Sequence, residues 1–503
     1  MAVDNLERVG NHAAFARPGR AGARGAGAGP ERGLGPGTKA SRGAGGGRLM
    51  RKTWTQLFAV VFAFSLVLAA CTGDDGGEAG GETGAETGGE ATGAVGSYSI
   101  PESTVRFGYY PCCADQSLWA VTHEKGFFSD VGITLDPEGG FLYPVFDQIT
   151  PSMQRGDYDA AATFIQGYLQ TLPTFGQDIP PILFHDIYVG YAILVSPESS
   201  AKTTEEFMAE GMSFPDAAAA AVSQLQGESV YTPPHGQVQP PYPQVFLNYA
   251  DMTYPGDLNL QFLEDNKIVQ LSAQPGRVEF AIPYAAPVLV QMLRNGFEPL
   301  INTQQVLEND VDSENGQLMT TLVGSSGIMA QRSWVESDRD TVLRFVSAMF
   351  RTLDYCLDPA TQLECWTIEA NQINATQGLD LIPEDIGVIF ESIDPLFPWE
   401  EQGPQLWEDP NAQFYVRDSL DVQIASLIEN GTLPDQEYDI DRFLVAEDIF
   451  FELRDLQEEA DALFADAEGL TGEAGELVAQ ARAQYDNYNF LDAVGLLKAA
   501  LGQ

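Results

Sequence analysis

Short apolar segments alternate with helical patterns over residues 103–445, and no other feature of the sequence restricts the fold as strongly. The first unit is a strand at 105–109, a helix at 118–125 and a second strand at 132–135. Units of this kind are typical of parallel sheets covered by helices. Further strands are expected at 160–165, 192–195, 229–232, 258–262, 279–283 and 320–323. Because this stretch exceeds the usual size of one hydrophobic core, we expect an α/β fold with two lobes.

A secretion signal precedes this domain. Two basic residues at 51–52 are followed by an apolar run that ends in two alanines and Cys71. The run is shorter than the roughly 20 residues that span a bilayer, which argues against the alternative of one transmembrane helix. The segment resembles a bacterial lipoprotein signal peptide at 50–70. We therefore expect lipidation of Cys71 and anchoring of the mature protein to the outer face of the cell membrane.

The segments on either side of this signal lack the pattern of a folded domain. Residues 1–49 are rich in Gly, Ala and Arg and show no hydrophobic period. We expect them to be untranslated, with Met50 as the initiator, or disordered. Residues 71–102 are rich in Gly, Glu, Thr and Ala, so we expect a flexible acidic tether between the lipid and the domain.

The charge of the chain argues against polyanionic partners. The sequence contains 26 Lys and Arg residues against 72 Asp and Glu residues, a formal net charge of −46. Such a field repels nucleic acid and keeps the protein soluble. We expect no nucleic-acid partner, and an acidic solvated surface without a ligand role explains most of this charge.

The end of the chain is helical in pattern. Apolar residues share one face of a helix predicted for 340–354, and a second helical stretch follows residue 448. The motif NYNFLDA at 487–493 resembles the turn of a helical-hairpin repeat. We expect residues 446–503 to form a C-terminal helical appendage.

Four cysteines lie beyond Cys71. Cys356 and Cys365 are close in the sequence of an exported domain, so we expect a disulfide between them. The adjacent Cys112 and Cys113 leave three alternatives, namely a vicinal disulfide, thiols that line a pocket, or structural filler. Neither pair has the spacing of a zinc ribbon, and we predict no metal site.

Several motifs occur in an order that indicates a family. They are VRFGYY (105–110), WAVTHEKGFF (119–128), RGDYDAA (155–161), RVEFAIPY (277–284) and GIMA (327–330), the last followed by VLRF (342–345). Together they resemble the substrate-binding proteins of the nitrate, sulfonate and taurine ABC importers and their relatives that bind thiamine pyrimidine precursors. Glu279 stands where that family usually has Asp. The resemblance covers about 103–445.

The resemblance implies a type II periplasmic-binding-protein fold with a C-terminal helical extension. Its two α/β lobes are joined by two crossing strands and close over a ligand. On this chain lobe 1 would comprise 103–197 and 325–445, and lobe 2 would comprise 198–324. The implied function is that of a monomeric solute-binding protein without a cofactor, which delivers a small molecule to the permease of an ABC importer.

Loops at the carboxyl ends of strands hold the ligand in such a fold. The candidates on this chain are Tyr109, Tyr110, Cys112, Cys113, Asp115, Gln166, Tyr168, His235, Gln237 and Tyr284. A loop-stabilising hydrogen bond is the alternative role for His235, and ordinary packing between lobes is the alternative for Tyr284. The loops contain no Arg or Lys, so an aromatic or heteroaromatic solute fits them better than an organic anion such as a sulfonate or nitrate, which remains the alternative.

An enzyme and a structural surface protein are the alternatives to a solute-binding protein. The four histidines are His12, His123, His185 and His235, and none belongs to a Ser-His-Asp, HExxH or P-loop motif. We therefore expect no catalytic residues and no enzyme activity, with a cell-surface enzyme as the alternative. A structural surface protein would explain the tether and the helical end, but not the ordered strands and loops.

Overall fold

A computed structural model describes residues 95–503, except 111–112, 144–147, 234–241 and 430. The expected signal peptide, Cys71 and most of the tether lie outside these residues. Within the described part, no helix combines the length and the apolarity that a membrane span requires. The same part contains no group of three or more His, Cys, Asp or Glu residues that could hold a metal ion.

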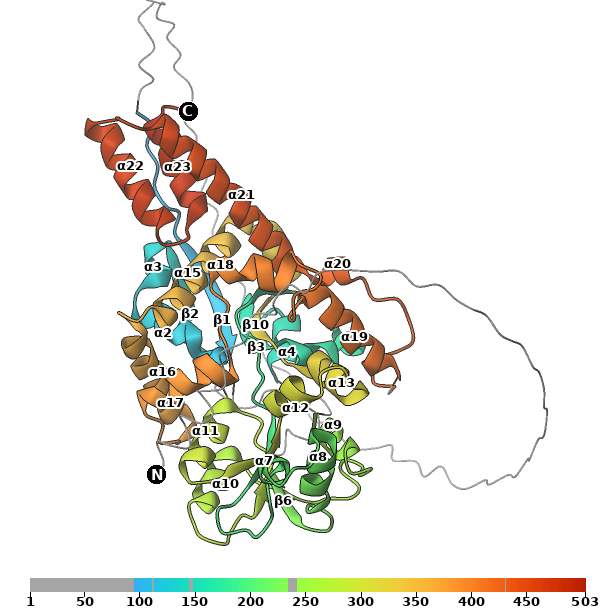
Figure 1. Cartoon of the computed structure of the whole chain (residues 1–503). Coiled ribbons are helices and arrows are strands. Elements are labelled where there is room, and N and C mark those ends of the chain that lie inside the picture. The colour runs from blue at the N-terminus through green and yellow to red at the C-terminus, as the bar shows by residue number, and fades with distance from the viewer. Residues whose placement is uncertain (1–94, 111–112, 144–147, 234–241, 430) are drawn as a thin grey trace, which may run out of the picture. The chain divides into compact units, whose positions relative to one another are not determined.

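Two five-stranded sheets form the framework of the fold (Figure 1). The first sheet has the strand order β2-β1-β3-β10-β4, and the second has the order β7-β6-β8-β5-β9. The first contains β1 (Ser103–Tyr109), β2 (Ile133–Leu142), β3 (Ala160–Phe164), β4 (Pro181–Phe184) and β10 (Ser326–Ala330). The second contains β5 (Ala192–Val195), β6 (Ser229–Thr232), β7 (Asn259–Phe262), β8 (Phe280–Ala281) and β9 (Glu298–Asn302). In both sheets the fourth strand in the order, β10 or β5, is antiparallel to its two neighbours.

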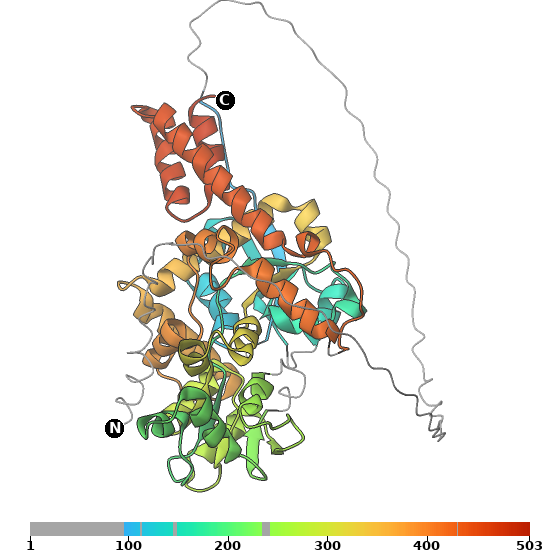
Figure 2. The ribbon, with the colours of Figure 1, turned by 45° about the vertical axis from the view of Figure 1, so that its right-hand side comes forward.

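Helices surround each sheet, so that the chain forms two lobes. Lobe 1 begins with η1 (Asp115–Ser117), α2 (Leu118–Glu124), α3 (Phe127–Asp130), α4 (Ile149–Gln154), α5 (Ile165–Leu169) and α6 (Leu172–Phe175). Lobe 2 contains α7 (Thr204–Ala209), α8 (Phe214–Ser223), α9 (Tyr242–Asn248), α10 (Asp265–Ser272), α11 (Ala286–Arg294), α12 (Thr303–Asn309) and α13 (Glu314–Leu322). The green elements of lobe 2 form one group in Figure 2.

Burial explains the central strands. All residues of β3 and of β10 are buried, as is usual for strands that are covered on both faces. The strand β1 is partly exposed at its start and buried over its last three residues. The expected unit at 105–135 is present as β1, α2, α3 and β2.

Two crossings, at 185–191 and 323–325, join the lobes. They pair with each other at one point, where the Tyr188 amide donates to the Gly324 carbonyl at 2.7 Å and the Gly324 amide donates to the Tyr188 carbonyl at 3.3 Å. This is the two-lobed arrangement expected from the sequence. The boundary expected after residue 197 is wrong, however, because β5 at 192–195 pairs in the second sheet. Its apolar run could serve either sheet, and only strand pairing assigns it.

Residues 320–322 of the strand expected at 320–323 are the end of α13 instead, and Val323 follows the helix. The Ser313 hydroxyl accepts a hydrogen bond from the Gly316 amide and starts this helix. The Thr320 hydroxyl then donates to the Gly316 carbonyl at 3.0 Å, within the helix. The capped helix thus overrides the β preference of Thr320 and Thr321.

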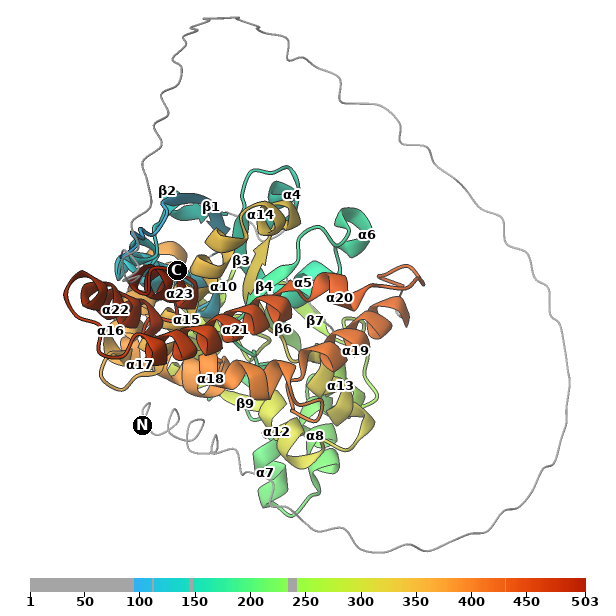
Figure 3. The same ribbon diagram turned by 90° about the horizontal axis from the view of Figure 1, so that it is seen from above.

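The chain after β10 is helical. It comprises α14 (Arg332–Ser337), α15 (Arg339–Leu357), α16 (Gln362–Gln377), α17 (Pro383–Val388), η4 (Ile389–Ile393), α18 (Trp399–Gln402), η5 (Gly403–Trp407), α19 (Val416–Glu429), α20 (Ile440–Phe443), α21 (Val445–Asp466), α22 (Gly472–Tyr485) and α23 (Phe490–Ala500). Figure 3 shows α21 running across lobe 1, and α21 contacts β4. The expected helical appendage is present as α21, α22 and α23. Cys356 at the end of α15 and Cys365 in α16 form the expected disulfide.

The end of the expected tether packs against the appendage. The Tyr98 hydroxyl donates to Asp492 in α23 at 2.5 Å, and the Gly96 amide donates to the Ala499 carbonyl at 2.8 Å. A Cβ atom at Gly495 would overlap the Tyr98 ring, so this ring lies directly on α23. The extension of the flexible tether to residue 102 is therefore wrong. The Gly-rich composition of the segment does not reveal that one tyrosine, Tyr98, packs on a helix.

Candidate functional site

The strand ends that should carry a ligand site lie side by side in each lobe. β1 and β3 are parallel neighbours, with Tyr109 opposite Ala162, so the segments that follow them begin at the same edge of the sheet. In lobe 2, β6 and β8 are parallel neighbours, with Tyr231 opposite Ala281. In each lobe the two segments that follow these strands therefore begin side by side, at the strand ends where ligands usually bind in α/β sheets.

Tyr109 closes β1 and is fixed by two contacts. Its ring centroid lies 4.3 Å from that of Trp119, and its hydroxyl accepts a hydrogen bond from Gln372 Nε2 at 3.1 Å. Burial raises the pKa of Tyr109, so the phenol stays neutral. Tyr110, the next residue, is half-buried.

The loop after β1 contains buried polar groups. The Ser117 hydroxyl donates to the buried carboxylate of Glu369 at 2.6 Å. Gln116 Oε1 and Trp119 Nε1 are buried without a hydrogen-bond partner among the described residues. Buried polar atoms are nearly always hydrogen-bonded, so these two atoms can accept or donate a further hydrogen bond to a group beyond the described residues. Cys113 is disulfide-bonded, which removes the free-thiol alternative for this residue, and its partner lies outside the described residues.

A cluster of tyrosines stands where the first crossing enters lobe 2. The Tyr191 ring stacks on Tyr242 at 4.1 Å between centroids with an interplanar angle of 24°, and it meets Tyr188 edge-on at 4.7 Å. Tyr242 also lies 4.9 Å from Tyr284, and its hydroxyl donates to the Pro283 carbonyl at 3.0 Å. We call Tyr188, Tyr191, Tyr242 and Tyr284 the tyrosine cluster.

Lobe 1 reaches the tyrosine cluster through Phe164, the last residue of β3. A Cβ atom at Gly324 would overlap the Phe164 ring and would lie 2.9 Å from the Tyr191 hydroxyl. Both groups therefore lie against the second crossing. The Tyr191 hydroxyl is buried and has no hydrogen-bond partner among the described residues. Aromatic groups of both lobes thus meet at the crossings.

The surroundings of the cluster are acidic. Asp186 is fully buried and accepts a hydrogen bond from the Ser326 amide at 2.6 Å, and Asp394 is also buried. Burial raises the pKa of Tyr191 far above its usual range, and the charges of Asp394 and Asp186 act in the same direction. His185 is buried as well, and the loss of hydration lowers its pKa to about 3, so it is neutral.

The structure places the predicted ligand residues unevenly. Tyr284 belongs to the tyrosine cluster, whereas Tyr168 packs inside lobe 1, where its ring stacks on Phe443 and its hydroxyl donates to the Gly176 carbonyl at 2.6 Å. For Asp115 in η1 and Gln166 in α5 only the backbone is described. Cys112, His235 and Gln237 lie outside the described residues.

Sequence reasoning missed Phe164, Tyr188, Tyr191 and Tyr242. The signal was present, because two tyrosines fall within four residues between the apolar runs that became β4 and β5. The sequence alone does not show that β4 and β5 belong to different sheets, which places these tyrosines at a crossing between the lobes.

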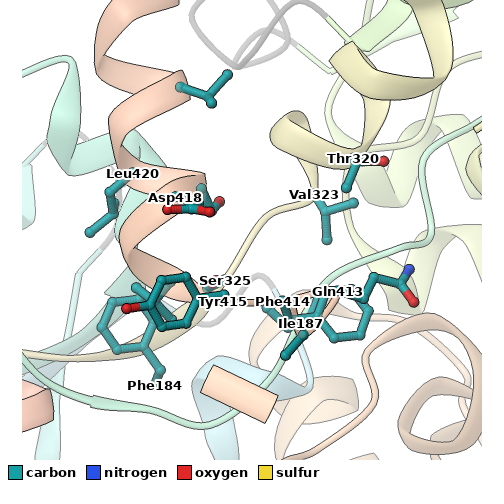
Figure 4. A pocket seen from close by; sticks show the side chains of 14 residues that line it. Phe184, Ile187, Thr320, Val323, Ser325, Gln413, Phe414, Tyr415, Asp418 and Leu420 are labelled. Carbon is teal, nitrogen blue, oxygen red and sulfur yellow. The ribbon is translucent and has the colours of Figure 1, made fainter. Parts of the chain in front are cut away.

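A second feature is a cavity of about 310 Å³ beside the crossings, which we call the hinge-side cavity (Figure 4). Ile187, Val323 and Ser325 of the crossings line it together with Thr320 of α13. Further lining residues are Phe184 at the end of β4, Ala412, Gln413, Phe414 and Tyr415 before α19, and Val416, Asp418, Ser419, Leu420 and Val422 of α19.

The chain is similar to solved structures, but no family model and no curated protein matches it. Among solved structures, the chain is similar to the periplasmic aliphatic sulphonate binding protein SsuA from Escherichia coli (15% identity, TM-score 0.44, 69% of this chain and 99% of that chain). It is also similar to the periplasmic nitrate-binding protein NrtA from Synechocystis PCC 6803 (14%, 0.45, 70% and 88%) and to the desulfurization enzyme DSZB (12%, 0.43, 70% and 99%). The similar structures thus include binding proteins and an enzyme.

Proposed function

We propose that the chain is an extracytoplasmic solute-binding protein of an ABC importer, which encloses a small aromatic or heteroaromatic solute between its two lobes. The observation that carries the proposal is the meeting of Phe164 from lobe 1 with the tyrosine cluster, which belongs to the first crossing and lobe 2. A ligand that touches both lobes favours the arrangement in which they approach each other, by its differential affinity for that arrangement.

The side chains support an aromatic solute with polar edges. Tyrosine rings offer faces for stacking, and ring pairs contribute about 0.5–1.5 kcal/mol beyond area burial. Gln116 Oε1 and Trp119 Nε1, which have no partner among the described residues, would offer one acceptor and one donor to a heterocycle. No Lys or Arg is among the described residues that we assign to this site. Their absence there disfavours an organic anion held by fixed positive charge.

Delivery and anchoring complete the proposal. A protein lipidated at Cys71 would hold the solute at the outer face of the membrane, where a permease could recognise the closed lobes. A Cys71→Ala variant should appear in the medium instead of the membrane fraction. Membrane retention of that variant would exclude the anchor while leaving solute binding untouched.

Binding is tested by native mass spectrometry of the purified protein, followed by fluorescence titration with pyrimidine, flavin and alkanesulfonate candidates. We expect a retained or added heterocycle to bind saturably. Tight alkanesulfonate binding without heterocycle binding would overturn the solute class. Absence of any saturable ligand would overturn the function.

A pair of Tyr→Phe variants separates binding from folding. Tyr191→Phe removes a hydroxyl that has no partner in the described part of the chain, so we expect roughly tenfold weaker solute binding and no loss of stability. Tyr168→Phe removes a hydroxyl that is bonded to Gly176, so we expect unchanged binding and a loss of about 1 kcal/mol of stability. Unchanged solute affinity in Tyr191→Phe would remove this hydroxyl from the site.

A further inference from the structure

The two crossings present different residues on their two faces. Tyr188 and Gly324 are paired. The Tyr188 ring packs on Tyr191, and Gly324 lies against Phe164 and Tyr191. Their neighbours Ile187, Val323 and Ser325 line the hinge-side cavity. Successive side chains of extended segments point to opposite sides. The hinge-side cavity is therefore separate from the proposed solute site and lies on the reverse face of the same crossings.

The interior of the cavity is apolar and preformed. Phe184, Ile187, Val323 and Leu420 line it and are buried in the described structure. Its volume of about 310 Å³ falls at the lower end of the range of small-molecule pockets. Shape and apolar lining suit one compact hydrophobic or aromatic group.

Negative charge stands at the rim of the cavity. Figure 4 shows Asp418 of α19 across the cavity from Thr320 and Val323. Asp418 is exposed and forms no ion pair within the described part of the chain. The neighbouring Arg417 is held by Asp441 and Glu447, each at 2.6 Å, so it does not neutralise Asp418.

We propose that the hinge-side cavity is a second ligand site, which takes a compact aromatic amine with its ring in the apolar interior and its ammonium group at Asp418. The site does not depend on the proposed solute function, since none of its lining residues belongs to the tyrosine cluster.

Occupancy of this site is coupled to the arrangement of the lobes. The cavity is walled by α13 of lobe 2 and by α19, which follows the return of the chain to lobe 1, and these two helices contact each other. A ligand that fills the space between them stabilises their present spacing. By linkage, any change in that spacing on solute binding alters the affinity for the amine.

The test is calorimetric titration of the full mature protein with tryptamine. Tryptophol and indole-3-propionate, which replace the ammonium with a hydroxyl and a carboxylate, serve as matched ligands. We expect saturable one-to-one binding of tryptamine, about fivefold weaker binding of tryptophol and no detectable binding of the anion. Equal affinity for all three, or no saturable heat with tryptamine, would overturn the proposal.

Variants on α19 locate the binding. Val422 lines the cavity and is 43% exposed, so Val422→Trp should fill the space without harming the fold and should abolish tryptamine binding. Asp418→Asn should weaken it about fivefold, whereas Asp421→Asn, an exposed change outside the lining, should leave it unchanged. If Val422→Trp fails to fold, the contrast between the two Asp→Asn variants decides. Equal effects of these two would refute the site.

Hydrogen exchange tests the coupling. Arg294 of α11 and Asp385 of α17 join the lobes away from the cavity, with Nη1 and Oδ2 2.6 Å apart. Saturating tryptamine should slow exchange about threefold or more in peptides of α11 and α17. Protection confined to peptides of 412–422 would overturn the coupling.

Discussion

The appendage is held to lobe 1 by a buried ion pair whose loss should have a large effect. Asp492 of α23 is fully buried and Arg344 of α15 is 3% exposed. Arg344 Nε lies 3.2 and 3.0 Å from the two carboxylate oxygens of Asp492, and Nη2 lies 3.1 Å from Oδ1. The Tyr98 hydroxyl and Asn489 Nδ2 donate to the same carboxylate at 2.5 and 2.6 Å.

Replacing Asp492 by alanine removes the only carboxylate bonded to Arg344 among the described residues and leaves the guanidinium buried. Breaking a buried pair in this way costs about 3–5 kcal/mol, because one charge remains without compensation. Substituting both partners by apolar residues, as in Arg344→Met with Asp492→Leu, removes that charge. We expect the free energy of unfolding of the double variant to exceed that of Asp492→Ala by about 2 kcal/mol or more.

Hydrogen exchange by mass spectrometry measures the loss of stability locally, in peptides that cover 490–500. Urea unfolding measures the loss for the whole protein. Asp492→Ala should lower the opening free energy of α23 by about 3–5 kcal/mol while peptides of lobe 2 change little. A loss below about 1 kcal/mol, or a double variant as unstable as Asp492→Ala, would refute the reasoning.

Three further predictions concern stability. The folded pKa of His185, about 3, lies below its ordinary value of 6.5, so unfolded chains bind more protons between these values. Stability should therefore fall as pH drops from about 6.5 towards 3, and His185→Gln should reduce that slope by up to about 1.4 kcal/mol per pH unit in urea titrations at pH 4 to 6. Cys356→Ser should lose about 2–3 kcal/mol in the same urea titrations, and reduction of the wild type should give the same loss. Gly324→Ala should cost about 1–3 kcal/mol in the same assay because its Cβ atom would overlap Phe164, and an unaffected melting temperature would contradict this packing.

Local patterns located many elements of the fold. The strands expected at 192–195 and 229–232 have those same bounds in the structure, and the helix expected at 340–354 lies within α15. These segments are apolar runs or amphipathic stretches whose period can be read without knowing their neighbours. The segment 320–323 has a β-like composition as well, but a helix that is capped at Ser313 includes residues 320–322.

The candidate site could be predicted only in part. The sequence indicated that loops after strands would carry it, and Tyr284 does belong to the tyrosine cluster. Tyr168 was an equally good candidate by position, yet its hydroxyl is bonded to Gly176 inside lobe 1. Composition cannot distinguish a ring that joins an aromatic cluster near the crossings from one that packs inside its own lobe.

The sequence by itself determined the alternation of strands and helices, the helical end and the proximity of Cys356 to Cys365, because each depends on residues close together in the chain. Tertiary structure alone decided that β5 joins the second sheet, that Tyr191 meets Phe164 at Gly324, and that 184–187, 320–325 and 412–422 enclose one cavity. These contacts join segments that are distant in the sequence, and their free energy depends on packing between elements that no local period encodes.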